Sequence, residues 1–192
     1  MAFSITTDRL LIRPWELRDR PAFAAMATDP EMMRFMTGGR PWNAEEIDGY
    51  FTRQAGTLEA NGFCLGALEE RATGRTIGLA GLQLLGSTGE LETGYWIARD
   101  LWGKGYASEA ASGALRHAFE GIGGARVMAI TDHENWASRR VMEKIGMTYL
   151  RDTNGVELGH RTPEIEVVLY SIERDVWAAS QSGTIRASPI SA

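Results

Sequence analysis

Three strand-like segments follow one another between residues 63 and 99 with only short breaks, and this run constrains the fold more than any other feature. FCLGALEE (63–70) and RTIGLAGLQLL (75–85) are joined by a turn containing ATG, which predicts a β-hairpin, and ELETGYWIAR (90–99) follows after GSTG. Helical segments stand before and after this block rather than between its strands. The chain therefore lacks the strand–helix alternation of a doubly wound dinucleotide-binding fold.

Helices and further strands surround the block. Asn43 and Glu46 match a capping box at the start of a helix, and GIGG at 121–124 is typical of a helix end. We expect one α/β domain over residues 1–177, with a poorly ordered tail at 178–192. Its mixed, mostly antiparallel sheet should have about seven strands, flanked by about four helices. The other strands are expected at 9–14, 125–131, 147–152 and 163–172, and the helices after Asp19, after Asn43, at 107–120 and at 136–145.

Composition narrows the class of protein. The chain has 192 residues, a formal net charge of −5 at pH 7 and one cysteine, Cys64, so an internal disulfide is impossible and a thiolate metal site is disfavoured. The acidic balance argues against broad nucleic-acid binding. No apolar run approaches the roughly 20 residues of a membrane span, and charges interrupt the N-terminal segment where a signal peptide is apolar. We expect a cytoplasmic protein with no metal, nucleic-acid or membrane partner, either a monomer or a homodimer.

Residues 102–110, WGKGYASEA, connect the strand at 90–99 to the helix at 107–120. Small residues at 103, 105 and 107 let the backbone approach a ligand closely, and a helix N-terminus adds a positive end, so the loop suits a pyrophosphate. Taken alone, the fragment favours an ordinary tight turn. We set aside an NAD site because Ser108 occupies the third glycine position of G-x-G-x-x-G.

A second strand–loop–helix unit contains NWASRRVMEKIGM (135–147). Asn135 stands at the junction of strand and helix, with Ser138 one turn along. Taken alone, Asn135 is a helix N-cap and the charged residues that follow form a solvated face. The two units would lie side by side if their strands pair in parallel, and both loops are rich in hydrogen-bonding groups. This juxtaposition favours a shared ligand site.

Several segments together resemble a known family. They are TTDRLLIRPWELRD, ATDPEMMRFM, PWNAEEI, ELETGYWIARDLWGKGYASEA, NWASRRVMEKIGM and VVLYSIERDVW, in this order over residues 5 to 177. In order and spacing they resemble the GNAT acyltransferase superfamily, and specifically the Rim-type acetyltransferases that modify protein N-terminal amines. The resemblance implies acetyl-CoA as donor, with its pyrophosphate in the 102–107 loop and its pantetheine arm along the strand that ends at 97–99. Asn135 matches the family asparagine that contacts this arm.

The resemblance assigns donor contacts to the strand end, the loop and the second helix: Ile97, Ala98, Arg99, Trp102, Gly103, Lys104, Gly105, Tyr106, Ala107, Ser108, Asn135, Ser138 and Arg140. Two positions depart from the family pattern. Trp102 stands where many members carry arginine or glutamine, which a loop that binds through its backbone tolerates. Met142 stands where many members have a tyrosine that protonates the departing thiolate. Ser138 is the candidate for that role, as a hydrogen-bond donor to the sulfur.

Transfer to an amine requires the neutral amine, so a general base assists it. Glu92 is the candidate base, because it lies on the strand beside the expected pantetheine arm and burial there would raise its pKa. The alternative is an exposed glutamate on an alternating strand. His160 is the rival base, whereas His117 and His133 are expected to be structural.

The acceptor pocket is expected to be lined by Phe35, Trp42, Tyr95, Trp96 and His160, although aromatic side chains are also common in cores. The expected function is direct acetyl transfer to a primary amine, either a protein N-terminus or a small molecule. Two alternatives stay open: an antibiotic- or polyamine-modifying acetyltransferase, and a non-catalytic acyl-CoA-binding module that senses or regulates.

Overall fold

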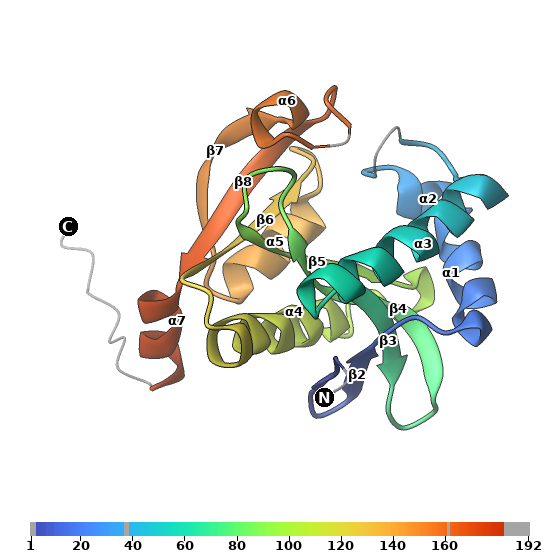
Figure 1. Cartoon of the computed structure of the whole chain (residues 1–192), viewed down its shortest axis with the longest axis horizontal. Coiled ribbons are helices and arrows are strands. Elements are labelled where there is room, and N and C mark those ends of the chain that lie inside the picture. The colour runs from blue at the N-terminus through green and yellow to red at the C-terminus, as the bar shows by residue number, and fades with distance from the viewer. Residues whose placement is uncertain (1–2, 37–38, 161, 183–192) are drawn as a thin grey trace.

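The computed structural model describes residues 3–36, 39–160 and 162–182. Within these residues, strands form one sheet in the order β1-β2-β3-β4-β5-β6-β8-β7 (Figure 1). Neighbouring strands are antiparallel throughout, except that β5 and β6 are parallel. The strands are β1 (Ile5–Thr6), β2 (Leu10–Arg13), β3 (Leu65–Glu70), β4 (Arg75–Leu84), β5 (Leu91–Ile97), β6 (Arg126–Thr131), β7 (Thr148–Asn154) and β8 (Glu166–Glu173).

The expected class, an α/β domain with a mixed, mostly antiparallel sheet, is confirmed. The described residues hold eight strands and seven α-helices, more than expected: α7 is a further helix near the expected tail, and β1, α2 and α6 have only two to four residues each. Periodicity gives no signal over so few residues. The helical elements are η1 (Leu17–Asp19), α1 (Arg20–Ala27), α2 (Pro30–Met33), α3 (Ala44–Asn61), η3 (Arg99–Leu101), α4 (Tyr106–Arg116), η4 (His117–Ile122), α5 (Trp136–Lys144), α6 (Gly155–Leu158) and α7 (Arg174–Gln181).

The last helix, α7, continues past residue 177 to Gln181, into the segment expected as a tail. Its Trp177 packs against Phe119 with ring centroids 5.2 Å apart and belongs to the main core. The rest of the expected tail, residues 183–192, lies outside the described residues.

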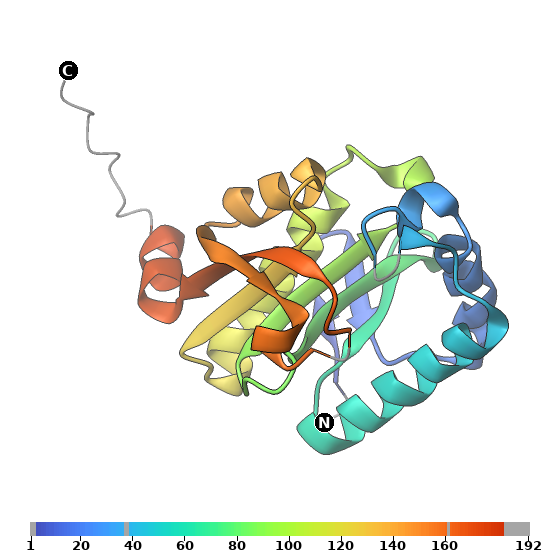
Figure 2. The ribbon, with the colours of Figure 1, turned by 90° about the horizontal axis from the view of Figure 1, so that it is seen from above.

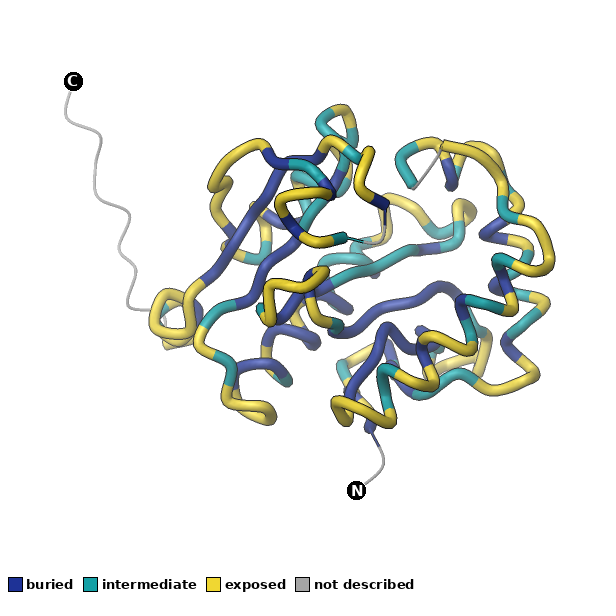
Figure 3. Tube along the Cα trace, turned by 45° about the horizontal axis from the view of Figure 1, so that its top comes forward, coloured by how far each residue is buried: buried dark blue, intermediate teal, exposed yellow. Residues whose placement is uncertain are grey.

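The two faces of the sheet carry different helices, and β5 contributes side chains to both. Leu91 and Ile97 join a core cluster with α4 and α5, whereas Trp96 joins a second cluster with α1 and α3. We call these the α4 face and the α3 face. In Figure 2 the sheet runs between α3, in teal, and α5, in gold. Figure 3 shows the central strands buried and the helices exposed along their outer sides. Successive side chains of β5 therefore reach opposite layers.

The sheet opens in its middle, between the two parallel strands. β5 and β6 pair only at Leu91 with Val127 and at Glu92 with Met128, although β5 runs on to Ile97. Beyond these pairs β5 stays bonded to β4, and β6 stays bonded to β8. The group of β6, β7 and β8 consequently leans away from β1 to β5 in Figure 1. The backbone edge of β5 after Glu92 thus has no strand paired to it on the side of β6, and we call this interruption of the pairing the opening.

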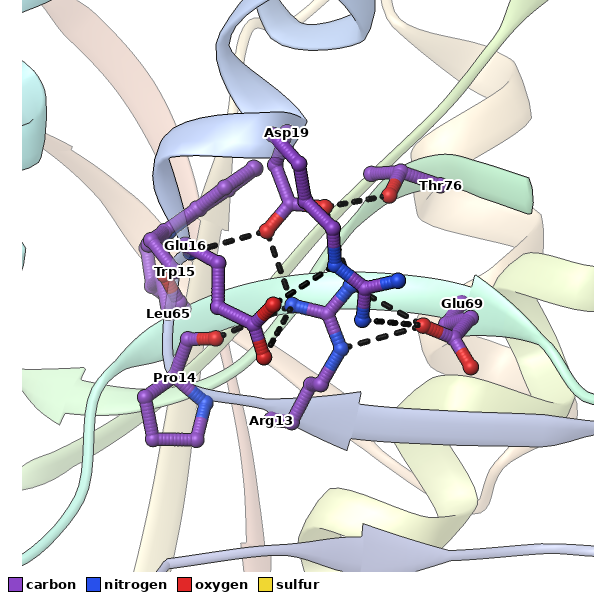
Figure 4. Close-up of polar contacts among 9 residues, drawn as sticks. Arg13, Pro14, Trp15, Glu16, Asp19, Leu65, Glu69 and Thr76 are labelled. Carbon is purple, nitrogen blue, oxygen red and sulfur yellow. Dashed lines mark hydrogen bonds and ion pairs between the residues drawn. The ribbon is translucent and has the colours of Figure 1, made fainter. Parts of the chain in front are cut away.

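A buried ion cluster fixes α1 to the first half of the sheet (Figure 4). The Arg13 guanidinium, at the end of β2, donates to Asp19 over 2.7 and 2.9 Å and to Glu69 on β3 over 2.9 Å. Asp19, only 1% exposed, also accepts from the Thr76 hydroxyl on β4 and from the Glu16 backbone N–H. Burial opposes ionisation of Asp19, but the hydrogen bonds from Arg13 and Thr76 lower its pKa overall.

Among the described residues, no helix combines the length and the apolar character that crossing a membrane requires.

Candidate active site

The loop that follows β5 presents unpaired backbone N–H groups at the start of α4. Gly103 and Gly105 have φ of +76° and +80°, the left-handed region that strains residues with a Cβ. No acceptor among the described residues faces six consecutive backbone N–H groups, those from Gly103 to Ser108. The last three belong to the first turn of α4, whose N-terminal end carries positive partial charge. The loop is therefore suited to an anion such as a phosphate.

The turn between β1 and β2 braces this loop from outside. Arg9 forms an ion pair with Glu109 in the first turn of α4, with Nε and Oε2 2.5 Å apart, and its guanidinium lies 4.4 Å from the ring centroid of Tyr106. Glu109 also accepts from the Thr7 hydroxyl over 2.6 Å and from the Arg9 backbone N–H over 2.8 Å. Partial burial opposes ionisation of Glu109, but these hydrogen bonds lower its pKa overall. Two segments about 100 residues apart in the chain are thereby locked together.

The same arginine sets the orientation of a peptide group in the loop. Arg9 Nη1 donates to the carbonyl oxygen of Lys104 over 3.1 Å. Because C=O and N–H point in opposite directions across a planar trans peptide, this bond turns the N–H of Gly105 away from Arg9. Sequence reasoning did not find Arg9 or Glu109, because no local pattern links a strand residue to a helix so distant in the chain.

Trp102, the departure from the family pattern, connects the loop to the end of β5. Its indole N–H donates to the carbonyl oxygen of Ile97 over 2.7 Å, while 49% of the residue stays exposed. Of the neighbouring residues expected to contact the donor, Ala98 donates its backbone N–H to Ile77 on β4. Arg99 forms an ion pair with Asp29, with Nε and Oδ2 3.2 Å apart. The indole N–H thus satisfies a backbone carbonyl at the end of β5.

Helix α5 lies across the opening from β5 on the α4 face. The Asn135 side chain accepts from the Ser138 backbone N–H over 3.1 Å, which makes Asn135 the N-cap of α5. The Tyr95 hydroxyl lies 3.1 Å from both the backbone oxygen and Oγ of Ser138. Burial raises the pKa of Tyr95 to about 12. Met142 is 2% exposed within the core, and Arg140, two residues before it on α5, is exposed.

Glu92 lies at the point where β5 and β6 separate and faces the opposite layer from Tyr95. It is 6% exposed, so the exposed alternative does not hold, and it accepts from the side-chain amide of Gln83 on β4 over 2.8 Å. Its partner in register on β6 is Met128, which joins an apolar cluster with α6 on the α3 face. The carboxylate therefore stands beside the opening, whereas Ser138 stands across the sheet from it.

The residues expected at the acceptor pocket separate into groups. Trp42 and Trp96 are in contact, with ring centroids 5.7 Å apart, within an aromatic cluster on the α3 face. Phe35 lies beside the guanidinium of Arg34, and His160 accepts at Nδ1 from the backbone N–H of Thr162 in its own loop. Tyr95 points to the α4 face instead, because it neighbours Trp96 on a strand.

The other two histidines, His117 and His133, and the cysteine, Cys64, contact neighbouring parts of the fold. His117 packs edge-on against Phe3, and burial lowers its pKa. The backbone oxygen of His133 accepts from Arg139 over 3.1 Å. Cys64 is buried, which raises the pKa of its thiol to about 11 and keeps it protonated. In the part of the chain that the structure describes, no group of three or more His, Cys, Asp or Glu side chains could hold a metal ion.

Comparisons with known proteins identify relatives of the chain. Residues 9–148 match the family model described as an acetyltransferase (GNAT) domain. The chain is 30% identical over 195 residues to the FsC-acetyl coenzyme A-N(2)-transacetylase of Aspergillus fumigatus, an alignment that covers 96% of this chain and 82% of that protein. It is 33% identical over 157 residues to the YkkB protein of Bacillus subtilis, covering 76% and 85%. A GNAT-family acetyltransferase structure from Bacillus anthracis superposes with a TM-score of 0.75 at 25% identity, covering 90% and 99%.

Proposed function

The chain belongs to the GNAT acetyltransferase family, and we propose that it is an acetyl-CoA-dependent N-acetyltransferase that moves the acetyl group directly to a primary amine. The observation that carries the proposal is the opening between β5 and β6, with a loop of unpaired backbone N–H groups beside the end of β5. An elongated donor with an anionic group at one end and amides along its length matches both features.

The residues that line this path fit such a donor. The N–H groups from Gly103 to Ser108 would hold the pyrophosphate, with Lys104 at the exposed rim. The open edge of β5, from Thr93 to Ile97 but without the Ile97 carbonyl that Trp102 occupies, would bond to the amides of the pantetheine arm much as a neighbouring strand would. Asn135 and Arg140 flank the opposite side on α5. Acetyl-CoA supplies the acetyl group as an activated thioester.

Proton handling is assigned to two side chains on opposite sides of the opening. In direct transfer the amine nitrogen bonds to the acetyl carbon, the carbon–sulfur bond breaks, and its electron pair stays on sulfur. Glu92 would accept the amine proton, directly or through water, because it is buried beside the opening on the α3 face. Ser138 would donate a hydrogen bond to the sulfur as negative charge develops there. His160 is the alternative base.

The α3 face is where we place the acceptor amine. Trp42 and Trp96 belong to its aromatic cluster and would line the approach to Glu92, and Phe35 and His160 are the further candidates for acceptor contact. The Aspergillus relative carries acetyl-coenzyme A and an N(2) position in its name, which supports transfer to nitrogen. Whether that amine belongs to a protein N-terminus, as in Rim-type enzymes, or to a small molecule is the finer question for experiment.

A substrate screen tests the proposal. Purified protein with acetyl-CoA is offered a panel of N-terminal peptides, polyamines, amino acids and aminoglycosides, with thiol release and product mass as readouts. We expect mass gains of one acetyl group on at least one amine class, and loss of that signal in the double variant E92Q/S138A. Tight acetyl-CoA binding without thiol release across the whole panel would favour a non-catalytic acyl-CoA-binding module instead.

A further inference from the structure

The hydroxyl of Tyr95 lies between β5 and α5, against Ser138. Tyr95 is part of the β5 segment that β6 does not pair, so its side chain projects beside the opening on the α4 face. Its oxygen is 3.1 Å from Ser138 Oγ and 3.1 Å from the Ser138 backbone oxygen. These two contacts tie the strand expected to bind the pantetheine arm to the side chain expected to act on the sulfur.

We infer that Tyr95 is a positioning residue that directs the Ser138 hydroxyl proton toward the donor sulfur. The inference rests on the proposed function, because it concerns the same donor site. It adds a residue that works through Ser138 rather than one that touches the acceptor.

Hydrogen-bond counting explains how this works. A serine hydroxyl has one proton, and a tyrosine hydroxyl has one proton. If Tyr95 donates to the Ser138 backbone oxygen, Ser138 Oγ can donate back to the tyrosine oxygen. If Tyr95 donates to Oγ, the serine proton must point elsewhere and becomes available to an acceptor in the opening. The hydroxyl pair thus has two arrangements, and negative charge developing on the sulfur favours the second.

The surroundings keep Tyr95 a donor in both arrangements. Burial raises the pKa of Tyr95 to about 12, so its phenol stays protonated at working pH and does not act as an acid itself. The family position for a tyrosine acid holds Met142 here, a side chain with no proton to give. Ser138 with Tyr95 behind it therefore supplies a hydrogen bond that the thioether of Met142 cannot.

The alternative is that the Tyr95 hydroxyl is only a structural tie between β5 and α5. Tyr170 offers a matched control for this reading. It lies on β8, is 1% exposed, and its hydroxyl also contacts α5, at Arg139 over 3.1 Å and at Glu143 over 3.2 Å. Tyr170→Phe removes a structural tie to the same helix without touching Ser138.

The experiment compares Tyr95→Phe, Ser138→Ala, the double variant and Tyr170→Phe in the full chain, with steady-state kinetics on an amine found in the screen. We expect Tyr95→Phe to lower kcat by roughly 3- to 10-fold, the range of one uncharged hydrogen bond, with the KM for acetyl-CoA within about twofold of wild type. The double variant should be no slower than Ser138→Ala, because Tyr95 acts only through the serine. Tyr170→Phe should keep the wild-type kcat.

Each of the remaining outcomes would overturn either the positioning role of Tyr95 or the proposed function. An unchanged kcat in Tyr95→Phe, or losses that multiply in the double variant, would overturn the positioning role. Equal kcat losses in Tyr95→Phe and Tyr170→Phe would assign both tyrosines to structural support of α5. A wild-type protein that transfers no acetyl group to any amine would overturn the proposed function, and this inference with it.

Discussion

Replacing Gly105 by valine tests whether the loop binds the donor. The same replacement at Gly62 controls for the backbone strain that a side chain causes in this conformation. Gly105 has φ +80° and ψ 5°, and Gly62, at the end of α3, has almost the same conformation with φ +77° and ψ 5°. A Cβ at Gly62 would meet nothing within 4 Å, and one at Gly105 would meet only Arg9 Nη2, at 3.6 Å. The two positions therefore differ in location and hardly at all in local strain.

The expected magnitudes follow from this match. A side chain in the left-handed region costs about 1–2 kcal/mol, so each variant should lose roughly 2–8 °C in Tm and keep its fold. Relaxation of the strain at Gly105 would also turn neighbouring N–H groups away from the donor phosphates. Each hydrogen bond to a charged group is worth about 1.5–3 kcal/mol, so acetyl-CoA affinity should fall about 10- to 150-fold for each N–H lost.

Calorimetric titration with CoA and with acetyl-CoA, alongside thermal unfolding, measures both quantities in the two variants. We expect similar Tm losses in Gly105→Val and Gly62→Val, but weakened binding only in Gly105→Val. Equal Kd values in the two variants would refute the assignment of the loop to the donor phosphates. A much larger Tm loss in Gly105→Val would instead refute the claim that its strain is local.

Three further predictions concern the brace, the base and the buried ion cluster. Arg9→Met keeps an aliphatic stem over the loop but loses its hydrogen bonds, so acetyl-CoA binding should weaken about 5-fold or more. The control, Arg71→Met, removes bonds to the carbonyls of Thr7 and Asp8 in the same turn and should bind acetyl-CoA as wild type does in the same titration. Glu92→Gln should lower kcat about 100-fold or more with little change in acetyl-CoA affinity, and wild-type rates in that variant would move the base to His160. Because the pKa of Asp19 is lower in the folded protein than its ordinary 3.8, its contribution to stability is complete above that pH and is lost as the pH falls through the folded pKa. Urea unfolding should therefore show that Asp19→Asn lowers the free energy of unfolding by about 3 kcal/mol at pH 7, with the difference from wild type shrinking below pH 3.8. A difference that does not change with pH would contradict the lowered pKa of Asp19.

Interactions between residues close together in the sequence made several helix starts and turns predictable. Asn43 and Glu46 form the reciprocal capping box expected from their spacing, and Asn135 caps α5 as its place at a strand–helix junction indicates. The glycines of the donor loop adopt positive φ because the turn needs it. Such features depend on residues within one turn of each other, which a single sequence displays.

Long-range register was the part that the sequence left open. Tyr95 and Trp96 are adjacent, so either could have faced the acceptor until the pairing of β4 with β5 fixed which side each takes. The brace from Arg9 to Glu109 also depends on how distant segments meet. No periodicity within one segment contains that information.

The interrupted pairing of β5 with β6 also has a mechanical consequence. β5 and β6 share only two residue pairs, so the edge of β5 beyond Glu92 has no strand bonded to it on that side. A donor bound along that edge, as we propose, would connect β5 to the β6 side of the sheet and add to the free energy of unfolding, by about 2.7 kcal/mol when free donor exceeds its Kd a hundredfold. The stability of the protein would then rise with the concentration of free donor.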